Sequence, residues 1–372
     1  MKIHSVKYYD NSREWGYDTI HFSDLTLLVG ISGVGKTQIL SSLFSLKCLA
    51  DGVIVNDLTW EISFSNNGAK YFWAGEFKKN SRNIRKEILE LNGEEVLKRN
   101  EDEVFYKGNK TIKLPPEKSL INLLKEEESV KKAFEGFEKI EIRDHATKGT
   151  SLKNYAELTF KVFDYVPKDV SEIEKKYKTL EEIRESDLDL IHKLYCINKN
   201  QKNTFNIIKE RFIEIFRQVE DIEIAVKDDD MFSIINQIIE IRIKEKGVNK
   251  WISHKWMSSG MLRTFLHLSE MYLLKKGSVV LIDEFETSLG TNCINALAED
   301  LMFENNDIQF IITSHHPYII NQIPYEYWKI VTRENGKIVT YNADEFNLGE
   351  SHHERFMNLI NLPKYKKGIV HA

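Results

Sequence analysis

The feature that most constrains this chain is a glycine-rich turn at residues 30–37, which reads Gly-Ile-Ser-Gly-Val-Gly-Lys-Thr. It fits the P-loop pattern, a glycine and four residues followed by Gly-Lys-Thr, at every position. Leu25–Val29 is a short apolar run that predicts a buried strand, and Gln38–Leu46 has apolar residues at helical spacing. A strand, a glycine turn and a helix N-terminus point backbone N–H groups and positive dipole potential into one concavity. The sequence therefore predicts a site for a nucleoside triphosphate.

Individual residues of this turn have predicted roles. Lys36 is predicted to reach the β- and γ-phosphates, and the Thr37 hydroxyl to bind Mg²⁺. A glycine-rich turn before an ordinary helix is the alternative, and the complete match between a strand and a helix disfavours it. The predicted ligands are ATP and Mg²⁺. The residues predicted to cradle the phosphates are Gly30, Ser32, Gly33, Val34, Gly35, Lys36, Thr37 and Gln38.

A second motif lies far downstream, where the apolar run Val279–Ile282 ends in the carboxylates of Asp283 and Glu284. Such a strand can deliver Asp283 beside the P-loop, where it would hold Mg²⁺ through the water shell of the ion. Glu284 is then placed to orient or deprotonate the attacking water. Many buried strands end in acids, so this prediction depends on the P-loop upstream.

Length and composition limit the classes of protein. The 372 residues suggest about two structural units, and the formal net charge of −5 argues mildly against a chain that binds nucleic acid as a polycation. Three cysteines lie far apart without a Cys-x-x-Cys pair, which argues against a zinc site and fits a reducing compartment. Because no signal peptide or membrane-length apolar run is evident, we expect a cytoplasmic protein without a membrane partner.

The order of predicted elements indicates an α/β fold. Alternating runs before Pro115 predict antiparallel strands, including one over Thr111–Leu114, whereas Ser119–Phe137 and Ser171–Val219 have helical patterns. Downstream, helices alternate with apolar strands, as a parallel sheet with crossover helices requires. We therefore predict a mixed sheet, a β-rich antiparallel section and a short helical insertion. The predicted domains are 1–165, the N-terminal half of the nucleotide-binding head, 166–237, the helical insertion, and 238–372, its C-terminal half.

A serine-rich segment, Met257-Ser258-Ser259-Gly260-Met261, directly precedes a predicted helix. Ser258 and Ser259 are candidates for the helix N-cap, and a serine and a glycine at this place can also bind phosphate. The order of P-loop, large insertion, Ser-Ser-Gly-Met, Ile-Asp-Glu and then Thr-Ser-His315 resembles the ABC-type ATPase heads of the SMC, RecF and OLD group. The predicted fold class is therefore an ABC-type ATPase head.

This resemblance implies a homodimer, or a higher homo-oligomer, that sandwiches ATP. Ser258, Ser259 and Gly260 would then contact the γ-phosphate held by the P-loop of a second subunit, and His315 would be the switch histidine. Ser288-Leu289-Gly290 stands where a dimer-contact loop, the D-loop, belongs. The catalytic residues implied are Glu284, His315 and Lys36.

The chain departs from the pattern of this group in three ways. Ser259 stands where many members have glycine, and Met261 stands where they have glutamine or glutamate. The glutamine usually found between the P-loop lobe and the helical insertion is absent, because no glutamine occurs between Gln38 and Gln201. The residue that contacts adenine is also open: Arg13, Trp15 and Tyr17 precede the P-loop, and a core role suits them equally well.

The compact insertion is similar to stand-alone ATPases of bacterial anti-phage systems, such as the ATPase subunits of Septu and PARIS and the ATPase half of OLD proteins. The resemblance implies a partner protein, a separate nuclease or toxin that this ATPase controls. The roughly thirty residues after the last predicted hairpin are too few for a nuclease domain. One alternative is a RecF- or SMC-like repair or recombination ATPase that acts directly on DNA, which leaves nucleic acid open as a partner. Another is a non-hydrolysing scaffold, which Glu284 disfavours.

Overall fold

The computed structural model describes residues 1–55, 57–143, 170–228, 237–286, 289, 291–302 and 307–370. The chain divides into two compact units. Unit 1 comprises residues 1–143, 277–285 and 304–372, and unit 2 comprises residues 144–276 and 286–303. The P-loop and the acidic strand belong to unit 1, whereas Ser258–Gly260 belong to unit 2. The domain boundaries predicted at residues 165 and 237 remain predictions.

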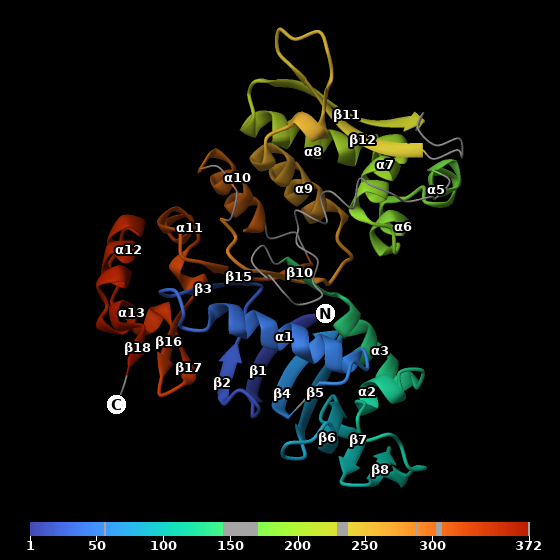
Figure 1. Ribbon diagram of the computed structural model, residues 1–372, viewed down its shortest axis with the longest axis vertical. Helices are drawn as coiled ribbons and strands as arrows, with labels where there is room; N and C mark the ends of the chain where they lie inside the picture. Colours follow the sequence, from blue (N-terminus) through green and yellow to red (C-terminus); the bar gives the residue numbers. More distant parts are fainter. Residues whose placement is uncertain are drawn as a thin grey trace. The chain divides into compact units, whose positions relative to one another are not determined.

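Unit 1 is built on one mixed sheet, which has 15 strands among the described residues (Figure 1). In spatial order they are β10 (Ile140–Arg143), β14 (Val279–Ile282), β15 (Gln309–Ser314), β3 (Leu25–Val29), β16 (Trp328–Glu334), β17 (Lys337–Asn342), β2 (Trp15–His21), β1 (Lys2–Asp10), β4 (Leu58–Asn66), β5 (Ala69–Phe77), β6 (Ile84–Leu91), β7 (Glu94–Asn100), β8 (Glu103–Tyr106) and β9 (Asn109–Lys110), with β18 (Ile369–Val370) beside β16. The predicted mixed α/β fold is confirmed. The strand predicted over Thr111–Leu114 is wrong, because β-pairing ends at Lys110.

The parallel part of the sheet carries both nucleotide motifs. β10, β14, β15, β3 and β16 pair in parallel, with Ile312 of β15 aligned to Ile282 on one side and Leu27 on the other. All residues of β3, β14 and β15 are buried, which explains why most of their side chains are apolar. Because the carboxyl ends of parallel strands meet at one edge of a sheet, the P-loop, the acidic pair and His315 emerge at the same edge.

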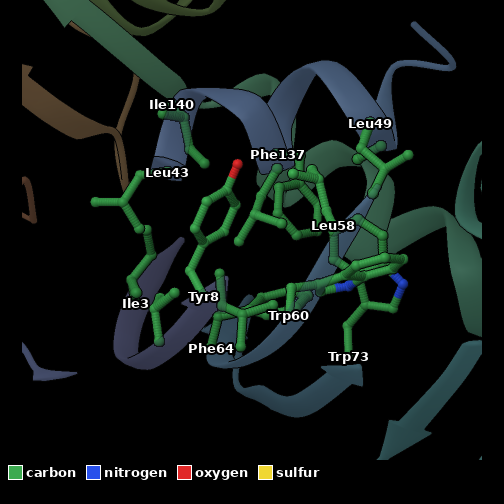
Figure 2. Packing of buried hydrophobic residues seen from close by; sticks show 14 of the residues in the cluster. Ile3, Tyr8, Leu43, Leu49, Leu58, Trp60, Phe64, Trp73, Phe137 and Ile140 are labelled. Carbon is green, nitrogen blue, oxygen red and sulfur yellow. The ribbon is translucent and has the colours of Figure 1, made fainter. Parts of the chain in front are cut away.

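The antiparallel part of the sheet holds the main core of unit 1. Figure 1 shows α1 (Lys36–Ala50) lying over β1, β2 and β4. Figure 2 shows Leu43 and Leu49 of α1 and Phe137 of α3 (Glu128–Glu138) in the same buried cluster as the tryptophans of β4 and β5. The ring of Trp73 lies 5.2 Å from that of Trp60 and 5.1 Å from that of Phe137, both edge-on. This aromatic cluster fixes α1, and therefore the P-loop before it, on the sheet.

The helix predicted over Ser119–Phe137 is instead two helices, α2 (Leu120–Leu123) and α3. The break covers residues 124–127, where Glu127 has an extended backbone as the N-cap of α3. Among its described residues, the C-terminal part of unit 1 has three further α-helices. They are α11 (Pro317–Gln322), α12 (His352–Asn361) and α13 (Pro363–Lys367).

Unit 2 combines helices with a small antiparallel sheet. Its helices are α5 (Val170–Lys176), α6 (Leu180–Glu185), α7 (Leu190–Asn200), α8 (Lys202–Ile215), α9 (Ser259–Leu273) and α10 (Thr291–Leu301), and its strands are β11 (Val219–Asp228), β12 (Gln237–Glu245) and β13 (Ile252–Ser253). The apolar stripe predicted for α8 is packed, since Phe212 is buried and meets Phe265 of α9 edge-on at 5.5 Å. The helical section predicted over Ser171–Val219 is too long at its C-terminal end, because Val219 already begins β11. None of the helices within the described ranges is long and apolar enough to cross a membrane.

A buried carboxylate joins the antiparallel strands to α2. Glu87 of β6 is 2% exposed, and its Oε1 accepts hydrogen bonds from Trp73 Nε1 at 3.0 Å and Ser119 Oγ at 2.6 Å. Its Oε2 accepts from the Leu120 N–H at 2.9 Å, at the start of α2. Burial raises the pKa of the Glu87 carboxyl above its ordinary value, although these donors oppose the shift.

We expect Glu87→Ala to lower the free energy of unfolding by about 2–5 kcal/mol, because three buried donors lose their acceptor. Glu87→Gln should lower the free energy of unfolding by less, since one carbonyl oxygen remains as an acceptor. Urea denaturation followed by circular dichroism measures the change. Glu90→Ala, a half-buried glutamate on the same strand, is the control and should change the value by less than about 0.5 kcal/mol. Equal stability of Glu87→Ala and wild type would contradict this role.

Candidate functional site

The P-loop lies between β3 and α1 in a backbone conformation that requires glycine. Gly33 has φ 86° and Gly35 has φ 110°, both in the left-handed region. Gly35 is the N-cap of α1, and no side chain caps this end of the helix. A Cβ on Gly30 would lie 2.5 Å from the Val331 carbonyl oxygen, so only glycine lets the loop start this close to β16.

Lys36, the first residue of α1, is only 9% exposed. Its Nζ donates hydrogen bonds to the Gly30 carbonyl at 2.7 Å and to the Ile31 carbonyl at 3.0 Å. The ammonium group is therefore held within the loop that precedes it. A cation in this place complements phosphate groups bound by the loop.

The Asp283 carboxylate connects α1 with two strands of the sheet. Asp283 is 4% exposed, and its Oδ2 accepts a hydrogen bond from Thr37 Oγ1 at 2.8 Å. Its Oδ1 accepts from the hydroxyl of Thr313, at the end of β15, at 2.6 Å. A hydroxyl and a carboxylate side by side are the hard oxygen donors that Mg²⁺ prefers when phosphates supply its other ligands. Thr37 and Asp283 therefore fit the metal predicted for them.

Glu284 follows Asp283 with φ 48°, a left-handed conformation that is unfavourable for glutamate. Its N–H donates to Thr313 Oγ1 at 2.8 Å, which helps to hold this backbone in place. His315 is exposed beyond the end of β15, whereas the Nδ1 of His316 accepts a hydrogen bond from the Tyr318 N–H at 3.2 Å and caps α11. His316 is thus a capping residue. The left-handed backbone of Glu284 is a strained conformation, and such strain is typical of functional sites.

These side chains meet in one cleft of about 360 Å³ within unit 1. Such a volume is in the usual range for small-molecule sites. Gly30 and Val34 are not among its lining residues, since Gly30 packs against β16 and Val34 is fully buried. The lining residues are Ser32, Gly33, Gly35, Lys36, Thr37, Gln38, Asp283, Glu284, Thr313, His315 and Arg333.

Two of the lining residues, Thr313 and Arg333, had no predicted role. Thr313 lies inside the Thr-Ser-His segment quoted above, so its place at the end of a buried strand was a usable signal. Arg333 is one of several charged residues on β16, and nothing in the local sequence distinguishes it. Trp15 and Tyr17, considered for adenine, are core residues at 5% and 3% exposure. The Tyr17 hydroxyl is hydrogen-bonded to Ser42, and burial raises the pKa of Tyr17.

The serine-rich segment belongs to unit 2 and forms the beginning of α9. Ser258 is the N-cap, as predicted, with its Oγ accepting a hydrogen bond from the Met261 N–H at 3.2 Å. Both Ser258 and Ser259 are exposed. Their role toward a nucleotide stays a prediction, as do the roles predicted for the lining residues. In the predicted D-loop, Ser288 and Gly290 lie outside the described residues.

Comparisons with known proteins fit this geometry. Residues 25–321 match the family model described as "AAA domain, putative AbiEii toxin, Type IV TA system". No curated protein sequence matches the chain. A solved structure, "Crystal structure of the SmcHead bound to the C-winged helix domain of ScpA", is 14% identical and covers 93% of this chain and 99% of that chain, with a TM-score of 0.53.

Two further SMC heads are less similar in structure. The "SMC head domain from Thermotoga maritima" is 14% identical and covers 92% of this chain and 99% of that chain, with a TM-score of 0.44. The other is an Smc head with an extended coiled coil, bound to the C-terminal domain of ScpA derived from Pyrococcus furiosus. It is 15% identical and covers 92% of this chain and 97% of that chain, with a TM-score of 0.47. We draw on the first structure for the fold alone. With the family match, it confirms the predicted resemblance to ABC-type, SMC-like ATPase heads.

We expect Thr313→Val to raise the Mg²⁺ concentration needed for half-maximal ATP hydrolysis about 10–100-fold. The substitution keeps the shape of the side chain but removes the hydroxyl that bonds Asp283 and the Glu284 N–H. Thr313→Ser retains that hydroxyl and should stay near wild type. A Mg²⁺ titration of the ATPase rate measures the effect. An unchanged Mg²⁺ requirement in Thr313→Val would show that Thr313 does not position Asp283.

Proposed function

Since the chain belongs to this AAA-domain family and has the SMC-head fold, we propose that it binds ATP with Mg²⁺ in the cleft of unit 1 and hydrolyses it. The observation that carries the proposal is the convergence of groups from two distant parts of the chain. Lys36 lies within the P-loop, Thr37 is bonded to Asp283, and Glu284 follows at the same edge of the sheet. This is the set that phosphoryl transfer needs: phosphate binding, metal binding and a group that orients water.

Each residue has a distinct chemical part in this proposal. The N–H groups at the start of α1 and the Lys36 ammonium would bind the phosphate chain. Thr37 and Asp283 would hold Mg²⁺, which when bound neutralises charge on the phosphates. Glu284 would orient the attacking water and accept its proton, and His315 would contact the γ-phosphate.

We further propose that two copies of the chain close around ATP. Ser258, Ser259 and Gly260 would complete the site of the second copy, because an exposed helix N-terminus can add donors to a γ-phosphate that it reaches. ATP would favour the closed dimer, and hydrolysis would release it. Trp256 supports an interface here: it is 84% exposed and only two residues before Ser258. Tryptophan is among the residues most enriched at the centres of interfaces.

The proposed output of this cycle is control of a separate effector, a nuclease or toxin, in anti-phage defence. One finding supports a protein partner: an SMC head of this fold was solved bound to a domain of another protein. The family description names a putative toxin of a TA system, which is compatible with a role in such a system. The motif order similar to anti-phage ATPases supports the same proposal.

Two variants test binding and hydrolysis separately. We expect Lys36→Ala to lose ATP binding, because the P-loop loses its cation, and Glu284→Gln to keep ATP binding but lower turnover at least about 100-fold. Isothermal titration calorimetry and phosphate release measure these effects. Glu284→Gln should also accumulate as an ATP-bound dimer in analytical ultracentrifugation. Wild-type turnover in Glu284→Gln would remove Glu284 from the role of base.

Tryptophan fluorescence gives an independent measure of the proposed dimer. Of the six tryptophans, four are at most 5% exposed, Trp251 is 37% exposed and Trp256 is 84% exposed. If the dimer covers Ser258, iodide should quench the fluorescence of Glu284→Gln less when ATP is present. Trp256→Phe should abolish most of this difference. Dimer formation without any change in quenching would place the interface elsewhere.

The effector proposal is tested by affinity purification of the chain from its native host, with and without ATP. We expect a nuclease or toxin to co-purify, and its activity to depend on whether the ATPase carries the Lys36→Ala substitution. Lys36→Ala provides the control for nucleotide dependence. A chain that purifies alone, and whose ATPase rate rises with DNA, would instead support the alternative of a repair ATPase and would overturn effector control.

A further inference from the structure

Arg333 enters the nucleotide cleft from β16, a strand that carries none of the motifs. β16 lies beside β3 in parallel, with Ile330 aligned to Val29 at the start of the P-loop. Arg333 lies three residues further along, so its side chain reaches the level of the P-loop and lines the cleft. Its Nη1 donates a hydrogen bond to Gln38 Oε1 at 3.0 Å, in the first turn of α1.

The environment of Arg333 differs from that of the arginines that form ion pairs with glutamate. Arg85, Arg211 and Arg242 each pair with a glutamate, at 2.7, 2.9 and 2.9 Å. Among the described residues, by contrast, no carboxylate lies within ion-pair distance of Arg333, and its side chain bonds the neutral amide of Gln38. Guanidinium groups have five N–H donors in a planar fork that matches phosphate oxygens. A partly buried arginine bonded to an amide in a phosphate-binding cleft therefore has the capacity to bind an anion.

The position of Arg333 is fixed from two sides, since on one side it pairs with Ile338 of β17. Its backbone N–H donates to the Gly368 carbonyl at 2.7 Å, and it aligns with Ile369 of β18. Gly368 is itself packed against the P-loop, since a Cβ there would lie 2.2 Å from the Ile31 side chain. Gly368 thus contacts both the strand that carries Arg333 and the loop that would bind phosphate. A binding group on such a rigid element loses little freedom when it meets its ligand.

We propose that Arg333 binds the phosphate chain of ATP within its own subunit, and that Gln38 is a positioning residue for its guanidinium. This inference rests on the proposed function of the cleft. It assigns to the site a second cation besides Lys36, contributed by a strand on the opposite side of β3 from β15 and β14. The ligand class is a nucleoside di- or triphosphate, because the guanidinium recognises the phosphates and not the base.

The test compares the binding of ATP, ADP and adenosine by isothermal titration calorimetry. We expect Arg333→Ala to raise the Kd for ATP and ADP about 10–100-fold, the usual loss for a hydrogen bond to a charged group. Arg333→Lys should be intermediate, because the charge remains but the fork is lost. The Kd for adenosine should stay the same. Lys329→Ala, which removes a cation from the same face of β16 outside the cleft, is the matched control and should bind ATP normally.

The positioning role of Gln38 is tested by a double-mutant cycle. Gln38→Glu would give Arg333 a carboxylate partner that competes with phosphate, so ATP binding should weaken in the presence of Arg333. The same change should have a much smaller effect in the Arg333→Ala background. A role of Gln38 in folding alone would give equal effects in both backgrounds and would overturn this part of the inference. Thermal unfolding of each ligand-free variant measures that structural contribution.

Two results would overturn the role of Arg333. The first is a Kd for ATP in Arg333→Ala within twofold of wild type, while Lys36→Ala abolishes binding; the cleft would then bind ATP without Arg333. The second is an equal loss of ATP and adenosine binding, which would assign Arg333 to the nucleoside or to the fold. Normal ATP binding by Lys36→Ala would instead remove the proposed function itself, so the two failures are distinguishable.

Discussion

The hydrogen bonds of the Asp283 carboxylate are the interaction on which the rest of the site depends. A carboxylate buried to 4% exposure is stable only when its oxygens are bonded, and here two threonine hydroxyls supply those bonds. Thr37 brings α1 to this carboxylate, and Thr313 brings the end of β15. Thr313 also bonds the N–H of Glu284. The hydrogen bonds around this one buried group thus hold the proposed metal ligands and the proposed base next to each other.

The sheet makes this arrangement attainable for segments that are far apart in the chain. Thr37 and Asp283 are separated by 246 residues, yet β3, β15 and β14 are consecutive neighbours in the sheet. Parallel pairing brings their carboxyl ends to one edge, and the all-buried side chains of these strands leave little freedom in register. The aromatic core beneath α1 supports the same arrangement from the antiparallel side. The chain between the motifs can therefore vary while the cleft stays in place.

In the proposed cycle, the charge balance of the cleft changes with the nucleotide. Asp283 and Glu284 contribute negative charge, and Lys36 and Arg333 contribute positive charge from two sides of the P-loop. ATP with Mg²⁺ would bring these groups together, and loss of the γ-phosphate would relax them. The serine-rich start of α9 is exposed in unit 2, and it would bind the γ-phosphate of a second copy only while that copy holds ATP. A protein partner would then respond to the dimer and not to ATP itself.

Much of this protein was predictable from its sequence because the relevant signals are local. The glycine spacing of the P-loop, the apolar strand that ends in Asp283 and Glu284, and the Ser258 N-cap each depend on residues next to one another in the chain. The pairing of Arg333 with Gln38, 295 residues apart, was not predictable, because it arises only when β16 settles beside β3. Likewise, the burial of Tyr17 and the division of α2 from α3 depend on packing against other elements. Local chemistry determined which motifs form, and strand pairing over long separations decided which side chains meet in the cleft.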